Sequence, residues 1–128
     1  MKTKIISRIL AALVVIFGMT GCYKDVTSPG SDPNGPPLNV SFSGDLIPLF
    51  NANCNTAGCH DGTAHSPDLR ADKAYAAITG GGWINTVVPS TSKIYVEVAS
   101  GSMPPTGALT AKQSQLILDW VRNGAPNN

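Results

Sequence analysis

The clearest helical pattern lies near the end of the chain, between Thr110 and Gly124. Apolar residues recur there at the three- and four-residue intervals of one helix face, at Leu116, Ile117, Trp120 and Val121. Thr110 and Gln113 have the spacing of a capping box, and Gly124 provides a stop signal. This pattern predicts an amphipathic helix that packs against a core.

A shorter helix is predicted earlier, over Asp45–Asn53, with Ser43 as its N-cap. Pro48 lies at or near the first turn, where its missing N–H group does little harm. The apolar side of this helix is formed by Leu46, Ile47, Leu49 and Phe50.

Two further helices are predicted in the middle of the chain. One covers Lys73–Thr79, with Asp72 as its cap and a run of glycines after it. The other covers Lys93–Ala99 and starts at Ser92. This last segment also alternates like a strand, at Ile94, Val96 and Val98.

The connections between these elements are long and rich in glycine and proline. The chain has 13 glycines and 10 prolines. Loops as long as 54–71 and 80–91 are unusual in a small domain unless they surround a ligand. The pattern therefore predicts one mostly α domain, over residues 41–128.

The first 21 residues have the pattern of an export signal. A basic start, with Lys2, Lys4 and Arg8, precedes the nine-residue apolar run Ile9–Phe17. Spanning a membrane takes roughly 20 apolar residues, so this run is too short to remain as a transmembrane helix.

The residues that follow the apolar run resemble a bacterial lipobox, because Thr20 and Gly21 directly precede Cys22. The resemblance implies that residues 1–21 are removed and that lipidated Cys22 anchors the domain to a membrane. The protein is then expected in the cell envelope, on the periplasmic or outer-membrane face. An ordinary signal peptide with an incidental Cys22 is the alternative.

Residues 22–40 are expected to form a linker between this anchor and the domain. The stretch 23–40 contains four of the ten prolines and almost no core-forming residues. A flexible linker of this kind would let the domain stand away from the membrane surface.

The charge balance excludes one large class of partner. Charged residues make up 13% of the chain, and its formal net charge is +1. Removing the leader takes away three basic residues and no acidic ones, which leaves six basic and eight acidic residues and a net charge of −2. Nucleic-acid binding needs a basic patch, so it is not expected, whereas a basic protein surface is a suitable partner.

The chemistry is concentrated in the segment Cys54–His60, whose sequence is CNTAGCH. Two cysteines followed directly by a histidine are the arrangement for covalent haem attachment. Each thiol forms a thioether with a porphyrin vinyl group, and the histidine is the proximal iron ligand. Four residues separate Cys54 from Cys59, whereas two is the usual number.

Most of the domain resembles the small c-type cytochrome domains of bacterial lipoproteins. The resemblance is carried by Val40–Gly62, Pro67–Ile78, Ser102–Pro105 and Leu109–Ala125. It implies a cytochrome c-like fold, in which a few short helices wrap around one covalent haem c and the first and last helices cross. It also implies that Met103 is the distal iron ligand.

The chemistry of Met103 independently favours this role. Met103 is the only methionine left after the leader, and Pro104 and Pro105 stiffen its loop. A thioether sulfur is a suitable sixth ligand for an electron-transfer haem. His65, five residues after His60, competes poorly because it lies on the same side of the macrocycle, and we expect it to be solvated.

The surroundings of the haem are predicted more coarsely. The Pro67 carbonyl could orient His60 through Nδ1. Trp83, Tyr95 and Arg70 are candidate partners of the haem propionates, whereas Trp120 is expected in the core. Expected haem-wall residues are Leu69, Val87, Val88 and Ile94.

The leading hypothesis is a membrane-anchored carrier of single electrons that exchanges them with redox partner proteins and is not an enzyme. A non-haem structural or binding module with a Cys54–Cys59 disulfide is the main alternative. A zinc site formed by Cys54, Cys59, His60 and His65 is a third hypothesis. A fourth keeps the haem but makes it catalytic or sensory, with a dissociable Met103.

Overall fold

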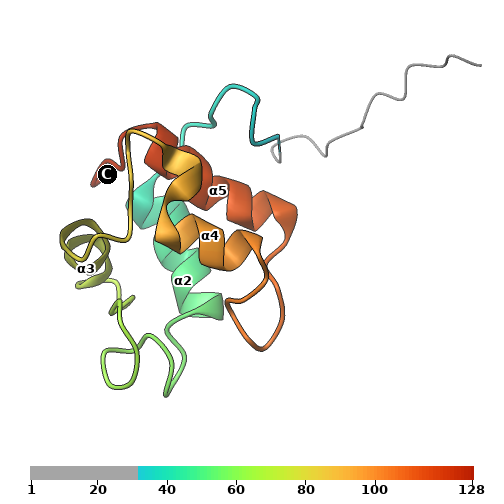
Figure 1. The fold of residues 1–128 in the computed structure, drawn as a ribbon. Coiled ribbons are helices and arrows are strands. Elements are labelled where there is room, and N and C mark those ends of the chain that lie inside the picture. Colours follow the sequence, from blue (N-terminus) through green and yellow to red (C-terminus); the bar gives the residue numbers. More distant parts are fainter. Residues whose placement is uncertain (1–31) are drawn as a thin grey trace, which may run out of the picture.

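A computed structural model describes residues 32–128 as a set of helices joined by loops (Figure 1). In chain order the elements are η1 (Phe42–Leu46), α2 (Ile47–Asn53), α3 (Ala74–Gly80), η2 (Pro89–Thr91), α4 (Lys93–Ala99) and α5 (Ala111–Arg122). Within residues 32–128 there is no β-strand, so the predicted mostly α class is confirmed. The predicted leader and Cys22 lie outside the described residues.

The first helical segment begins earlier than predicted. Ser41, and not Ser43, is the N-cap, and the π-helical turn η1 leads directly into α2. The Ser41 hydroxyl accepts the N–H of Gly44 at 3.0 Å, while the Asp45 carboxylate accepts the N–H of Ser41 at 2.8 Å. These reciprocal bonds satisfy N–H groups at the helix start, and this explains the early start.

The boundaries of α3 are close to those predicted, but its cap is not. α3 spans Ala74–Gly80, and its N-cap residue is Lys73, which makes no side-chain capping bond. Asp72 is exposed instead, and its carboxylate lies 3.6 Å from the Lys73 ammonium group. The predicted capping role of Asp72 is therefore wrong.

The segment 93–99 is a helix, which settles the choice between helix and strand. Ile94 and Val98, four residues apart, are buried, whereas Val96 is 45% exposed. A strand would have placed all three on one face. Ser92 precedes α4 without a side-chain capping bond, because its hydroxyl accepts the N–H of Asn85 at 2.9 Å.

The predicted capping box of α5 is confirmed. The Thr110 hydroxyl accepts the N–H of Gln113 at 3.2 Å, and the Gln113 side chain accepts the N–H of Thr110 at 2.9 Å. Gly124 follows the helix with a φ of +88°, a conformation that glycine adopts without strain. The sequence therefore predicted both ends of this helix.

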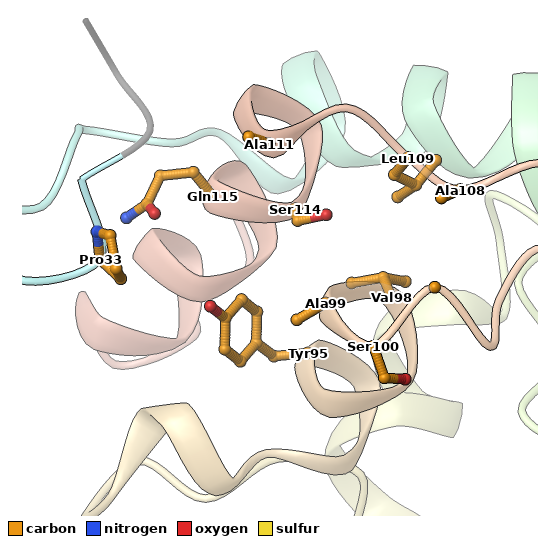
Figure 2. A pocket seen from close by; sticks show the side chains of 11 residues that line it. Pro33, Tyr95, Val98, Ala99, Ser100, Ala108, Leu109, Ala111, Ser114 and Gln115 are labelled. Atoms are coloured by element: carbon orange, nitrogen blue, oxygen red, sulfur yellow. The ribbon is translucent and has the colours of Figure 1, made fainter. Parts of the chain in front are cut away.

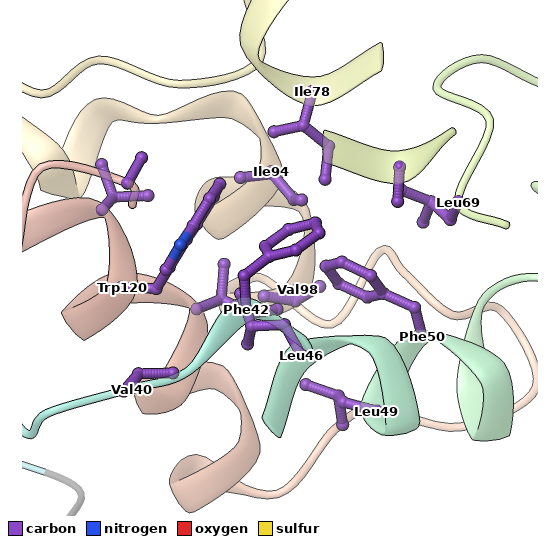
Figure 3. Close-up of a cluster of buried hydrophobic side chains, with 14 of the residues drawn as sticks. Val40, Phe42, Leu46, Leu49, Phe50, Leu69, Ile78, Ile94, Val98 and Trp120 are labelled. Atoms are coloured by element: carbon purple, nitrogen blue, oxygen red, sulfur yellow. The ribbon is translucent and has the colours of Figure 1, made fainter. Parts of the chain in front are cut away.

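The core contains the buried rings of Phe42, Phe50 and Trp120 (Figure 3), and the partly buried Tyr75 packs against them; these four residues are here called the aromatic core. The Phe42 ring lies 5.1 Å from Trp120 and 5.3 Å from Tyr75, between ring centroids. Trp120 has no exposed surface, and its indole N–H donates to the Pro126 carbonyl at 2.9 Å. The expected core position of Trp120 is confirmed, and its contact with Phe42 joins the first helical segment to α5.

Hydrogen bonds attach the end of the predicted linker to α5 and to the residue that follows it. The N–H of Leu38 donates to the buried carboxylate of Asp119 at 3.1 Å, and Asn123 donates to the Leu38 carbonyl at 2.6 Å. Arg122 bridges Asp119, at 3.0 Å, and the Gly35 carbonyl, at 2.5 Å. Ordered contacts thus begin before the boundary at residue 41 that the sequence suggested.

Candidate functional site

A cavity of about 330 Å³ gathers most of the predicted site residues. Its volume is in the range of small-molecule and cofactor sites. It lies between the loop that follows α2, the buried side of α4 and the loop that precedes α5. The predicted residues that line it are Cys54, Cys59, His60, Leu69, Ile94 and Met103.

The residues 54–70, here called the motif loop, leave α2 at Cys54 and run toward α3 (Figure 1). The N–H of Cys54 still bonds to the Phe50 carbonyl at 2.8 Å, so its position is set by the helix. The four residues between the cysteines form a turn in which the Cys59 N–H donates to the Thr56 carbonyl at 2.9 Å. Gly58 takes a φ of +79° in this turn. The unusual spacing is thus accommodated by a hydrogen-bonded turn.

Asp61 ties this turn to the residues that follow it. Its carboxylate accepts the Gly58 N–H at 3.1 Å, the Thr63 N–H at 3.1 Å and the Thr63 hydroxyl at 2.6 Å. The Thr63 hydroxyl, followed by the backbone N–H groups, lowers the pKa of Asp61 to about 2. Asp61 was not among the predicted site residues, although an Asp two residues before a Thr is a turn signal.

His60 is oriented by the Pro67 carbonyl, as predicted. Its Nδ1 lies 3.0 Å from that oxygen, which only accepts hydrogen bonds, so Nδ1 carries the proton. Nε2 then keeps its lone pair for a metal. The His60 carbonyl accepts the Leu69 N–H at 2.8 Å, and this bond closes the motif loop behind the imidazole.

The two cysteines of the motif loop are free thiols in the structure. Burial, and to a smaller extent the neighbouring Cys59, raises the pKa of Cys54 to about 11. Cys54 therefore stays protonated at neutral pH. The Cys59 sulfur accepts a hydrogen bond from the Thr56 hydroxyl at 3.3 Å.

Met103 reaches the same cavity from the loop before α5. It is 39% exposed, while the adjacent Pro104 is buried. The Met103 N–H donates to the Glu97 carbonyl at 3.0 Å, which attaches this loop to α4. A thioether and an imidazole from distant parts of the sequence thus line one cavity.

His65 is exposed, as expected, and lies at the cavity on the His60 side. The centroids of the two imidazole rings are 6.3 Å apart. Among residues 32–128, no group of three or more His, Cys, Asp or Glu side chains is arranged to hold a metal ion.

The prediction of the cavity wall is wrong for two of the four expected residues, Val87 and Val88. Val87 is 88% and Val88 is 47% exposed, and neither lines the cavity. Their N–H groups both donate to the side chain of Asn85 at 3.0 Å, and this turn directs the valines to solvent. Trp83 and Val98 line the cavity instead.

The other candidate propionate partners lie away from this cavity. Arg70 is exposed and pairs with Asp68 at 2.6 Å. Tyr95 lines a second cavity of about 440 Å³ between α4 and α5, where Ser100, Ser114 and Gln115 are the other polar side chains (Figure 2). The second cavity is the larger one, but its lining contains no thiol, imidazole or carboxylate.

No family model, curated protein or solved structure matches this chain. Within residues 32–128, none of the helices has the length and apolar character needed to cross a membrane. The function must therefore be argued from the cavity itself.

The donor set of the cavity fits an iron porphyrin. It offers two thiols for thioether bonds, an imidazole with a free Nε2 and a thioether sulfur. Leu69 and Ile94 are 4% and 8% exposed and provide apolar wall surface. These side chains are of the types needed for thioether attachment and for His/Met ligation.

Proposed function

We propose that this protein is a c-type cytochrome that carries single electrons. The observation that carries the proposal is the meeting of Cys54, Cys59, His60 and Met103 at one cavity with apolar walls. A bound haem c would supply reversible one-electron chemistry at its iron. The helical fold and the contact between the first helical segment and α5 are compatible with a cytochrome c-like domain.

Each residue has a defined task in this proposal. Cys54 and Cys59 hold the cofactor through thioether bonds. His60 ligates the iron through Nε2, and Pro67 keeps the imidazole in the required tautomer. Met103 would hold the iron through its thioether sulfur, which would leave no open site for a substrate, so we propose a carrier and not an enzyme.

The cellular setting follows from the N-terminal sequence. We propose that lipidated Cys22 anchors the protein in the cell envelope, on the periplasmic or outer-membrane face. Its partners would be redox proteins, reached by the domain at the end of its linker. The mature net charge of −2 favours partners with a basic surface.

The decisive experiment is to express the full chain in a host with c-type cytochrome maturation and to purify it from the membrane. We expect a Soret band that survives acid–acetone extraction, and a mass increment of one haem on the peptide that contains Cys54 and Cys59. Colourless protein with a reducible Cys54–Cys59 disulfide would favour the alternative of a non-haem module.

Ligation by Met103 is tested separately with Met103→Ala in the haem-loaded protein. We expect loss of the weak sulfur-to-iron absorption band and a lower reduction potential, because a thioether favours ferrous iron. An unchanged spectrum would assign the sixth position to another group. Rapid carbon monoxide binding by the wild-type ferrous protein would favour the catalytic or sensory hypothesis.

A further inference from the structure

Glu97 is an acidic residue that lines the cavity. It lies on α4 between Ile94 and Val98, which line the same cavity at helical spacing. Its side chain is half-buried, and its backbone carbonyl holds the Met103 N–H at 3.0 Å. Among the described residues, no other aspartate or glutamate lines this cavity.

Glu97 forms no ion pair within residues 32–128. The ion pairs of residues 32–128 involve other acids, namely Asp68, Asp72 and Asp119. Lys93 is one turn away on α4, but its ammonium group lies 4.5 Å from the centroid of the Trp83 ring. The described lining of the cavity also contains no lysine or arginine. Glu97 is thus a half-buried acidic residue of the cavity lining that forms none of the described ion pairs.

A carboxylate near a haem interacts differently with the ferric and the ferrous iron. Reduction of a haem iron from ferric to ferrous adds one electron, so the ferric centre is more positive by one charge. A nearby carboxylate stabilises the more positive state, and apolar walls strengthen the interaction because they lower the local dielectric constant. We propose that Glu97 lowers the reduction potential of the iron held in this cavity, an inference that rests on the proposed function.

The test compares redox titrations of the haem-loaded wild type, Glu97→Gln and Glu97→Asp. The matched control is Asp72→Asn, which removes the same charge at a carboxylate that is 72% exposed and does not line the cavity. We expect Glu97→Gln to raise the midpoint potential, with a change of about fivefold in the ferric-to-ferrous ratio at a fixed applied potential. Glu97→Asp should restore most of the wild-type value, and Asp72→Asn should leave it nearly unchanged.

The ferric absorption spectrum distinguishes a charge effect from a structural one. We expect the sulfur-to-iron band to be retained in Glu97→Gln, since the Met103 bond uses the Glu97 backbone and not its side chain. Loss of that band, or a potential equal to that of the wild type, would overturn the role of Glu97 and leave the proposed function intact. Wild-type protein without covalent haem would overturn both.

Discussion

The aromatic core and the motif loop are connected through α2, but different interactions stabilise them. In the core, Phe42 and Trp120 are almost fully buried and pack against other rings. In the motif loop, Asp61 and His60 are held by hydrogen bonds around a cavity. α2 joins the two regions, because Phe50 belongs to the core and Cys54 begins the loop.

The aromatic core therefore contributes mainly to stability, whereas the motif loop contributes mainly to the candidate site. Side-chain burial supplies most of the free energy of folding, so damage to the core should unfold the domain. The side chains of the motif loop form turns and supply the candidate cofactor ligands. Substitutions in this loop should remove the cofactor chemistry with a smaller effect on the fold. Substitutions in each region can test this division.

The largest effect on stability is expected from Trp120→Ala. It removes a fully buried indole and the ring contact with Phe42, and should lower the free energy of unfolding by about 3–5 kcal/mol. Urea denaturation followed by circular dichroism measures the change. Val87→Ala, at a side chain that is 88% exposed, is the control and should change stability by less than about 0.5 kcal/mol. Equal losses of stability in the two variants would contradict the placement of Trp120 in the core.

The next largest effect is expected from His60→Ala, and it concerns the site rather than the fold. The variant should lose the low-spin haem spectrum, while the helical circular dichroism stays near the wild-type level. His65→Ala is the matched control, since its ring is nearby but exposed and makes no bond to Pro67. A low-spin spectrum that depends on His65 and not on His60 would reverse the assignment.

An intermediate effect is expected in the reactivity of Cys54 in protein produced without haem attachment. Burial raises the Cys54 pKa from 9.0 to about 11, so the folded chain should hold roughly a hundredfold less Cys54 thiolate at pH 8 than the unfolded chain. Alkylation should be correspondingly slow and should speed up as the pH approaches 11. Mass spectrometry of Cys54 peptides, with and without urea, measures the rates. Equal rates would mean that the motif loop is unfolded without haem.

The smallest effect is expected from Thr110→Ala, which removes one side of the capping box of α5. The loss of the bond from the Gln113 N–H should cost about 1 kcal/mol of stability. The haem spectrum should not change, because Thr110 does not line the cavity. Thr110→Ser, which keeps the hydroxyl, should restore most of the stability.

Local patterns predicted the helices well where the relevant interactions are local. The capping box of α5 needs only Thr110 and Gln113, three residues apart, and it was found from spacing alone. The start of the first helix was misplaced because Ser41 and Ser43 are both acceptable caps by type. The structure distinguishes them, since the Ser41 hydroxyl accepts the Gly44 N–H at 3.0 Å and the Asp45 carboxylate accepts the Ser41 N–H at 2.8 Å.

The sequence also predicted most of the site residues, for a chemical reason. Thiols, imidazole and thioether are rare groups, and their order from Cys54 to Met103 indicates a ligand set. Wall residues such as Val87 and Val98 carry no such signal, since every valine is apolar. Only their positions in the fold show that Val87 faces solvent and Val98 faces the cavity.

By itself, the sequence determined the mostly α class, the helix near the C-terminus and the identity of the groups that can bind a cofactor. The tertiary structure alone decided which apolar side chains line the cavity and that Glu97 lines it without forming an ion pair within residues 32–128. The reason is physical. Helix periodicity and donor chemistry are properties of neighbouring residues, whereas burial and charge compensation depend on segments that meet only after folding.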